Sequence, residues 1–504
     1  MSTTISETRL GVWRMLLFVL LGRLALILAV SFPCFAQQAD YSQLYRPQYH
    51  FSPLRNWTND PNGLVYFEGE YHLFFQYNPF GDEWGHMSWG HAVSRDLLHW
   101  QELPVAIPES DGVMIYTGST VVDGQNTSGL CTNGPCMVAI YTGQNPKRDS
   151  QPGFETQNLA YSNDRGRTWT KYSGNPVLNL NMTDFRDPKV FWSKQAGTWV
   201  MVVALPNEHK VLIYHSPDLK HWTKKSEFGP AGATGGQWEC PELFELPVEG
   251  KRDTRWVLKI GVNPGALQGG SGEQYFIGRF DGVRFTNDNS PATTLWTDYG
   301  KDCYCALTFN NLPREQKPVM IGWMNNWQYA AKLPTSPWRG QMTIPRQLSL
   351  RQTREGIRLF QKPLEQLESL LEEESGRDPG HSFVLAFSLH AKAGHEVGLK
   401  LLSDASYSTE IGYDPAKKVL FVDRTHSGLT NFSKDFPARV EAPLNAEGAS
   451  ISVRVLVDRL SVEVFADDGR VVVTNLVFPP PHANSFESLG GKVPAVIEPV
   501  HSIH

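Results

Sequence analysis

A pattern of an apolar stretch, Ser-x-Asp and then Trp recurs along the first half of the chain. It reads GHAVSRDLLHW at 90–100, NLAYSNDRGRTW at 158–169 and VLIYHSPDLKHW at 211–222, with a weaker copy, YFIGRFDGVRF, at 275–285. Each copy is typical of a strand, an Asp-containing turn and a Trp-bearing strand. A unit of roughly 60 residues with other β-like stretches between the copies has room for four strands. The repeat therefore predicts a β-propeller.

The extent of the repeat region predicts the number of blades. Residues 45–355 hold room for five units, so we expect a five-bladed propeller in this range. A pair of all-β sandwiches is the alternative, but the Trp-marked repeat favours the propeller. The 43 Gly and 34 Pro of the chain suit many short strands joined by tight turns.

The chain changes character after the repeats. Residues 356–378 are predicted to be a linker with a short helix, because Leu364, Leu367, Leu370 and Leu371 fall on one helical face. Alternating apolar residues return in 379–504, and their pattern predicts a C-terminal β-sandwich. The fold class is therefore expected to be all-β, a propeller followed by a sandwich.

The N-terminal segment differs in composition from the rest. An apolar run behind Arg9 and Arg14 ends in small residues at Cys34-Phe35-Ala36. This pattern is typical of a secretory signal cut after Ala36, and an uncleaved membrane anchor is the alternative. We expect residues 1–36 to be a signal peptide. The mature chain is then secreted, extracellular or periplasmic, with no stable membrane insertion.

Charge and cysteine usage exclude several classes of function. The formal net charge is −6, so no basic field exists to hold nucleic acid. No CxxC, HExxH or EF-hand pattern occurs, so neither a metal nor another cofactor is expected. Cys131 and Cys136 flank a turn that a small disulfide could close in an oxidising compartment. Cys303 and Cys305 are two residues apart and are not expected to bond each other.

Three acids stand in related contexts: Asp60 in NDPNG, Asp187 in FRDPKVF and Glu239 in WECPELF. Each precedes an apolar, strand-like run, and Pro follows directly or one residue later. Pro fixes φ and biases the residue before it toward extended backbone, which aims the acid rigidly. Any one Asp-Pro is commonly just a turn. Three matched contexts on different repeat units instead favour one shared site in the propeller's central funnel.

The blocks around these acids resemble a known family. NWTNDPNG, FFQYNPFGDEWGHMSWGHAVSRDLLHW, FRDP and WECPEL are similar to the signature blocks of glycoside hydrolase family 32, which holds invertases, levanases and exo-inulinases. The resemblance covers the mature chain and implies a five-bladed propeller with a C-terminal β-sandwich. It places the nucleophile on Asp60, the transition-state stabiliser on Asp187 and the acid/base on Glu239. Thr58 is a departure, because the family usually has Met there.

The implied chemistry is that of a retaining glycosidase, which needs one ionised carboxylate and one carboxylic acid. We expect hydrogen bonds to keep Asp60 ionised, and burial beside two carboxylates to keep Glu239 protonated. Arg186 is expected to keep Asp187 ionised, and Cys240 is expected to pack behind the acid/base as a small buried residue. A separation of about 5–5.5 Å is predicted between the carboxyls of Asp60 and Glu239.

A fructose pocket needs aromatic faces for C–H surfaces and amides for hydroxyls. The resemblance implies that Arg186 is joined there by Trp57, Asn59, Gln76, Trp84, Tyr116, Thr117 and Trp323. For each Trp, core packing is the alternative, and it explains most of the 15 Trp of the chain.

The function implied by the resemblance is that of a secreted β-fructofuranosidase. It would release terminal fructose from levan or inulin and also cut sucrose. The segments WGHMSWGHAVS and WMNNWQYAAKLPTSPWRG are closer to exo-levanases and exo-inulinases than to plant or yeast invertases. Two alternatives stay open: a fructosyltransferase, and a non-catalytic fructan-binding protein, against which the presence of all three acids argues.

Overall fold

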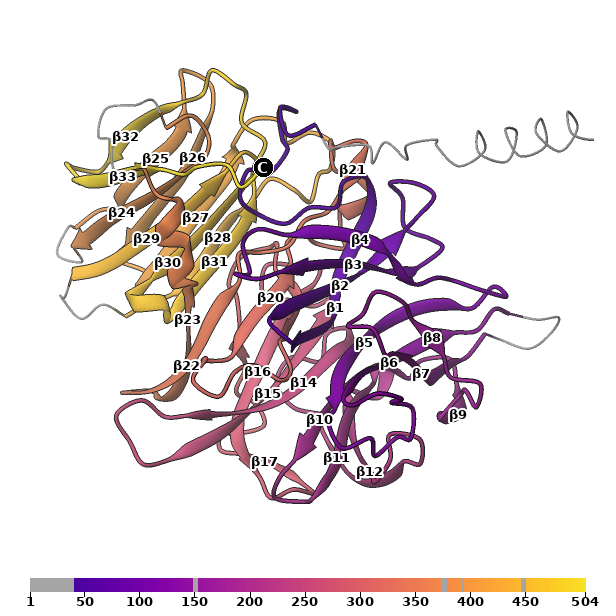
Figure 1. Ribbon diagram of the computed structural model, residues 1–504. Helices are drawn as coiled ribbons and strands as arrows, with labels where there is room; N and C mark the ends of the chain where they lie inside the picture. Colours follow the sequence, from indigo (N-terminus) through magenta and orange to yellow (C-terminus); the bar gives the residue numbers. More distant parts are fainter. Residues whose placement is uncertain (1–39, 148–152, 373–378, 391–393, 446–449) are drawn as a thin grey trace, which may run out of the picture. The chain divides into compact units, whose positions relative to one another are not determined.

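Strands make up almost all of the regular structure (Figure 1). The computed structural model describes residues 40–147, 153–372, 379–390, 394–445 and 450–504, so the expected signal peptide lies outside the described residues. The helices in these ranges are 3-10 turns: η1 (Pro206–Glu208), η2 (Ala330–Lys332), η3 (Glu365–Leu370) and η4 (Asp467–Gly469). None of these turns has the length or the apolar character that a bilayer crossing requires.

Five sheets in the described part of the chain form the blades of the expected propeller. The first blade contains β1 (Asn56–Phe67), β2 (Glu70–Asn78), β3 (Ser88–Ser94) and β4 (Gln101–Ile107), with β21 (Trp338–Arg339) parallel to β1. The second contains β5 (Met114–Asp123), β6 (Cys136–Gln144), β7 (Glu155–Ser162), β8 (Thr170–Lys171) and β9 (Leu178–Met182).

The remaining three blades follow in chain order. The third contains β10 (Arg186–Ser193), β11 (Thr198–Leu205), β12 (Lys210–Ser216) and β13 (Thr223–Phe228). The fourth contains β14 (Gln237–Pro247), β15 (Thr254–Asn263), β16 (Gly272–Phe280), β17 (Phe285–Asn287) and β18 (Leu295–Trp296). The fifth contains β19 (Tyr304–Thr308), β20 (Val319–Trp323), β22 (Arg346–Thr353) and β23 (Gly356–Pro363).

The sequence repeat marks the same turn in successive blades. In the first blade, the Ser94 hydroxyl at the end of β3 accepts the amide of Leu97, and the Trp100 indole donates to the Leu97 carbonyl at 3.1 Å. The second and third blades repeat the indole contact, from Trp169 to the Gly166 carbonyl and from Trp222 to the Leu219 carbonyl. Ser-x-Asp therefore builds the turn, and Trp closes it.

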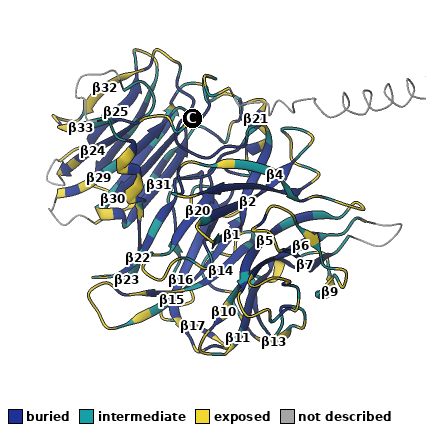
Figure 2. Cartoon of the chain, in the orientation of Figure 1, coloured by how far each residue is buried: buried dark blue, intermediate teal, exposed yellow. Residues whose placement is uncertain are grey.

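Packing between neighbouring blades explains why the middle strands are apolar throughout. Along β11, Met201 and Val203 belong to the core shared with the second blade, whereas Val200 and Val202 belong to the core shared with the fourth. Successive side chains of a strand point to opposite faces. Both faces of the sheet are covered, so β11 has no polar face and is almost entirely buried (Figure 2).

The inner strands of the five blades, β1, β5, β10, β14 and β19, contact one another in a ring. The pairing of each shifts register within its first few residues: at Thr58/Pro61, Ile115/Gly118, Arg186/Lys189, Glu239/Glu242 and Tyr304/Leu307. A β-bulge interrupts regular pairing and re-aims the side chains within it. The ring therefore directs one short irregular segment from every blade toward the same central region.

The segment between propeller and sandwich differs from the expectation. Residues 356–378 were predicted to be linker, but Gly356–Pro363 forms β23 and pairs with β22, so the fifth blade runs past residue 355. The linker helix is the 3-10 turn η3, in which Leu367 and Leu370 are buried. Apolar residues three apart match the three residues per turn of a 3-10 helix. Residues 373–378 of the predicted linker lie outside the described residues.

The C-terminal strands form the expected sandwich of two five-stranded sheets. One contains β24 (Phe383–His390), β29 (Ser450–Asp458), β30 (Ser461–Ala466), β31 (Val471–Leu476) and β33 (Ala495–Pro499). The other contains β25 (Val397–Ser403), β26 (Ser408–Asp414), β27 (Val419–His426), β28 (Arg439–Pro443) and β32 (Ser485–Leu489). Leu385 of the first sheet and Leu399 and Ile411 of the second lie in one buried core.

Buried ion pairs join the sandwich to the propeller. His50 places Nδ1 2.9 Å from Asp458 and Nε2 2.8 Å from Glu463, and all three side chains are fully buried. Arg346, on β22 of the propeller, pairs with Glu463 and with Asp298. Every carboxylate of this interface network, defined here as His50, Asp298, Arg346, Asp458 and Glu463, therefore faces a cationic partner.

Candidate active site

A cavity of about 320 Å³ lies among the bulged ends of the inner strands. It is lined by Asn59, Asp60, Gln76, Trp84, Tyr116, Thr117, Glu155, Arg186, Asp187, Glu239, Asn263 and Trp327. The cavity thus brings together every predicted site residue except Trp57 and Trp323. The three acids come from β1, β10 and β14, as the different repeat units require.

Asp60 lies in the bulge of β1 and is almost completely buried. Its Oδ2 accepts a hydrogen bond from the Thr117 hydroxyl at 2.8 Å, whereas its Oδ1 accepts none from the described residues. Burial raises the pKa of Asp60 to about 6, the Thr117 hydrogen bond opposes this rise, and the Glu239 carboxylate adds to it. Asp60 is therefore mostly ionised at neutral pH, and one of its buried oxygens makes no hydrogen bond to the described residues.

Asp187 lies in the bulge of β10 with a left-handed backbone, φ 66°. Its Oδ2 accepts the amide of Cys240 at 2.9 Å, and its own amide donates to the Thr142 hydroxyl. Burial raises the pKa of Asp187 well above its usual range, although the charge of Arg186 opposes the shift. Arg186 therefore acts on Asp187 in the expected direction, but burial is the larger effect.

Glu239 lies in the bulge of β14 and is the most exposed of the three acids, with 18% of its side chain accessible. Its Oε1 accepts hydrogen bonds from Arg186 at 3.0 and 3.2 Å. Its Oε2 accepts the hydroxyl of Tyr304, from the bulge of β19. Burial raises the pKa of Tyr304 well above its usual range, so this phenol keeps its proton and acts as a donor.

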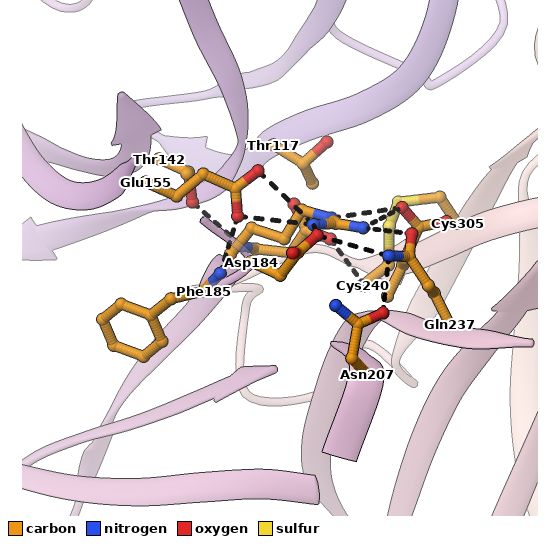
Figure 3. Close-up of polar contacts among 12 residues, drawn as sticks. Thr117, Thr142, Glu155, Asp184, Phe185, Asn207, Gln237, Cys240 and Cys305 are labelled. Carbon is orange, nitrogen blue, oxygen red and sulfur yellow. Dashed lines mark hydrogen bonds and ion pairs between the residues drawn. A yellow bond between two sulfur atoms is a disulfide. The ribbon is translucent and has the colours of Figure 1, made fainter. Parts of the chain in front are cut away.

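Arg186 bridges several acceptors rather than serving Asp187 alone, and three of them, Glu155, Asp184 and Gln237, are labelled in Figure 3. Besides Glu239, its guanidinium donates to Asp184 at 3.1 Å, to Glu155 at 3.3 Å and to Gln237 at 2.8 Å. Glu155 also accepts the amide of Phe185, and burial raises its pKa. One guanidinium with planar geometry therefore fixes the pocket wall between β7, β10 and β14.

The tryptophans separate into two layers. Trp57 and Trp323 are 1% and 0% exposed and do not line the cavity, which corrects their predicted place on its wall. They pack behind Trp327, with ring centroids 6.0 and 4.8 Å away. Trp84 does line the cavity and is 46% exposed. The aromatic faces open to a ligand are thus those of Trp84, Tyr116 and Trp327.

Neighbours of Asp60 in the opening strand have structural roles. The Trp57 indole donates to the Asn59 side-chain oxygen at 2.8 Å, which orients that amide at the cavity wall. The Thr58 hydroxyl donates to the Gln76 carbonyl of β2 at 3.0 Å and is fully buried. The Thr58 hydroxyl therefore supplies a hydrogen bond between β1 and β2 where the bulge interrupts their backbone pairing.

Cysteines form two disulfides in the described part of the chain. Cys131 and Cys136 are bonded across their turn. Cys240 is buried beside the acids, as expected, and it is bonded to Cys305, a disulfide that the sequence did not predict. Both residues lie in bulges that bring β14 and β19 together. Asp60 and these two sulfur atoms lie within 4.8 Å of one another, but a disulfide offers no thiolate to a metal.

Three lining residues were not predicted from the sequence: Glu155, Asn263 and Trp327. Trp327 lies in the segment WMNNWQYAAKLPTSPWRG, where the resemblance implied the neighbouring Trp323 as the pocket residue instead. Asn263 ends β15, and Glu155 begins β7. Neither has a local motif, because their place at the cavity depends on pairing with strands far away in the chain.

The chain is similar to known proteins along most of its length. A levanase of Bacillus subtilis (strain 168) is 45% identical over 480 residues, which cover 90% of this chain and 69% of that protein. An extracellular exo-inulinase of Aspergillus niger is 42% identical over 517 residues, covering 93% of this chain and 96% of that protein. The crystal structure of the exo-inulinase from Aspergillus awamori matches with a TM-score of 0.87 at 40% identity, over 92% of this chain and 100% of that one.

Two family models match the chain, one over the propeller and one mainly over the sandwich, and they overlap in the fifth blade. The model of the glycosyl hydrolases family 32 N-terminal domain matches residues 50–363, which end with β23. The model of the family 32 C-terminal domain matches residues 348–498, which include the sandwich strands. With both domains matched and the acids gathered in one cavity, this chain belongs to glycosyl hydrolase family 32.

Proposed function

We propose that this protein is a β-fructosidase that releases terminal fructose from β-fructans, levan or inulin, and also cuts sucrose. One observation carries the proposal: Asp60, Asp187 and Glu239 line a single cavity, and an oxygen of Asp60 is left without a hydrogen bond. The names of the relatives, a levanase and exo-inulinases, support fructan as the substrate class.

Asp60 is the nucleophile in this proposal. Its Oδ1 attacks the anomeric carbon of the terminal fructosyl unit, while Thr117 holds Oδ2 in place. The result is a fructosyl-enzyme ester with the configuration inverted once. Water then displaces the carboxylate and inverts the carbon a second time. The fructose released has the configuration of the substrate.

Glu239 is the acid/base. It protonates the leaving oxygen in the first step and takes a proton from water in the second. Its greater exposure suits this role, because the leaving group and the incoming water both approach from the open side of the cavity. Asp187 holds the hydroxyls of the fructosyl unit and stabilises the transition state.

The size of the cavity supports attack at chain ends. A volume of about 320 Å³ holds a terminal sugar but not a continuous stretch of polymer. Trp84 and Trp327 supply the aromatic faces for sugar C–H surfaces.

Product analysis tests the reaction and its stereochemistry together. We expect free fructose as the first product from levan, inulin and sucrose, and NMR of early time points should show the β-anomer before mutarotation. The α-anomer as first product would contradict the double displacement. Growth of fructan chains at high sucrose would instead identify a fructosyltransferase, and binding without any cleavage would identify a fructan-binding protein.

We also propose that the chain is exported and cleaved after Ala36. Two disulfides suit an oxidising compartment, and the related exo-inulinase is named extracellular. N-terminal sequencing of protein recovered outside the cytoplasm should begin at Gln37. Retention of the first 36 residues in membrane fractions would contradict the proposal.

A further inference from the structure

Two adjacent residue pairs connect β14 to β19. Glu239 and Cys240 lie in the bulge of β14, and Tyr304 and Cys305 lie in the bulge of β19. Tyr304 donates to Glu239, and the two cysteines beside them form the disulfide visible in Figure 3. The acid/base is thus attached to the neighbouring blade by a hydrogen bond and, one residue on, by a covalent bond.

Cys240 also contacts both of the other acids. Its amide donates to Asp187 Oδ2 at 2.9 Å, and its Sγ lies 3.8 Å from Asp60 Oδ2. The backbone of Cys240 is left-handed, with φ 50°, and that of Cys305 is left-handed with φ 46°. Residues with a side chain keep this conformation only where their surroundings enforce it. The amide direction that serves Asp187 therefore depends on what holds Cys240.

We propose that the Cys240–Cys305 disulfide is a positioning element of the active site. It fixes the Cys240 amide on Asp187 and turns toward Asp60 a sulfur atom that has no proton to donate. The cysteines do not line the cavity, so they act through the acids and not on the substrate. This inference rests on the proposed function, because it assigns Asp60 and Asp187 their roles in fructosyl transfer.

Opening the disulfide would change the chemistry next to the nucleophile. A dithiol or phosphine reductant supplies two electrons, the S–S bond breaks, and two protons from water complete two thiols. The Cys240 thiol could then donate to Asp60 Oδ2, where the disulfide sulfur cannot. A new donor stabilises the carboxylate and makes it a weaker nucleophile.

The other groups around Asp60 set the background for this effect. The hydroxyl of Thr117 donates to it from β5, and charged or titratable side chains reach it from β10, β14 and β19: Asp187, Glu239 and Tyr304. None of these contacts is made by Cys305. Removing Cys305 therefore alters the sulfur beside Asp60 and the hold on Cys240, while the other groups keep their places.

Peptide mapping under non-reducing conditions is the first test. We expect one cross-linked species that joins the peptides containing Cys240 and Cys305. Recovery of both cysteines as separately alkylated thiols from active protein would overturn the inference.

Kinetics of Cys305→Ala form the second test, with Cys136→Ala as the matched control that opens the other disulfide. For Cys305→Ala we expect kcat on inulin or sucrose to fall on the order of tenfold, since small misplacements of reacting groups cost this much or more. The acid limb of kcat/KM should move down by about half a pH unit, because a thiol hydrogen bond favours the Asp60 anion. Cys136→Ala should leave both unchanged.

The double variant Cys240→Ala/Cys305→Ala separates the two effects and carries the test if the single variant does not fold. It has no thiol donor, so kcat should still fall while the acid limb stays at the wild-type pH. An unchanged kcat in the folded variants would overturn the positioning role. A wild type that releases no fructose would overturn the proposed function and this inference with it, whereas equal rates in active wild type and variants would overturn the inference alone.

Discussion

The acids of the cavity and those of the interface network are two of the buried carboxylate clusters in the described residues, and they differ in their balance of charge. In the cavity, Asp60, Asp187 and Glu239 share one nearby cation, Arg186, which makes its hydrogen bonds to Glu239 and to other acceptors. In the interface network, Asp458 and Glu463 face His50, and Glu463 also faces Arg346.

Their titration behaviour follows from this balance. Burial raises the pKa of Asp60 to about 6 and that of Asp187 well above its usual range. Burial would do the same to Asp458 and Glu463, but their cationic partners hold the pKa of both below the usual range. Buried acids with too few cationic neighbours have raised pKa values, which is typical of functional sites. Buried acids with matched cations stay ionised and link the two domains by ion pairs.

The largest expected effect comes from Asp60→Asn, which preserves shape but removes the charge. We expect fructose release to fall by at least about 10⁴-fold, since the attacking group is lost. Because the folded pKa of Asp60 is about 6 against an ordinary 3.8, its ionisation at pH 7 costs the fold about 3 kcal/mol. The variant should therefore be more stable than wild type at pH 7 in urea unfolding. A variant less stable than wild type at pH 7 would contradict the inference that the ionised Asp60 destabilises the fold.

Glu463→Gln should have the opposite outcome, a loss of stability with nearly unchanged activity. It leaves His50 and Arg346 buried with an incomplete set of acceptors, and breaking such a pair costs about 3–5 kcal/mol. The activity of the folded fraction should stay within about twofold of wild type, since the interface network does not line the cavity. The exposed Glu487→Gln in the same domain is the control and should change neither quantity. Loss of activity without loss of stability would break the comparison.

The interface network should also respond to pH through His50. Burial alone would lower the pKa of His50, but its hydrogen bonds to Asp458 and Glu463 and the charges of these two acids together raise it from 6.5 to about 9. A raised pKa contributes stability that is complete below pH 6.5 and is lost as the pH rises through 9. The free energy of unfolding of wild type should exceed that of His50→Gln at pH 6, and this difference should be about 3 kcal/mol larger than the difference at pH 10. Urea midpoints at both values measure this, and a constant difference would contradict it.

Local sequence was sufficient for features that depend on local chemistry. The Ser-x-Asp turns closed by Trp100, Trp169 and Trp222 identified the blades, and the Pro-flanked acids identified Asp60 and Asp187 as neighbours in space. Turn chemistry and strand alternation repeat at fixed spacing, so one sequence carries them without structural information.

Features that depend on contacts between neighbouring blades were not predictable from the sequence. The Cys240–Cys305 disulfide and the contact of Tyr304 with Glu239 arise because the bulges of β14 and β19 coincide. Nothing in the spacing of 65 residues indicates that coincidence. The same holds for Trp327, whose exposure at the cavity depends on Trp57 and Trp323 packing behind it.

The division between exposed and buried Trp gives a smaller test. Trp327→Ala removes an aromatic face from the cavity, and KM should rise about tenfold, the equivalent of about 1.4 kcal/mol of binding. Trp323→Phe keeps an aromatic ring in the buried layer and should lower stability by about 1–2 kcal/mol with little change in KM. Equal effects of the two variants on KM would show that the buried Trp layer affects substrate binding as much as the Trp that lines the cavity.

The smallest effect is expected from Thr58→Val, and Thr117→Val is its matched partner because both lose only a hydroxyl. The Thr58 hydroxyl donates to the Gln76 carbonyl, so its loss should cost about 1 kcal/mol of stability and leave kcat/KM within about twofold. The Thr117 hydroxyl donates to Asp60 itself, so its loss should raise the pKa of that acid and lower kcat about tenfold. Two residues of the same type, each buried beside the same bulge, thus report separately on the fold and on the nucleophile. If Thr58→Val reduced kcat as much as Thr117→Val, the bulge of β1 would itself control the position of the carboxylate, and the departure at Thr58 would belong to the chemistry.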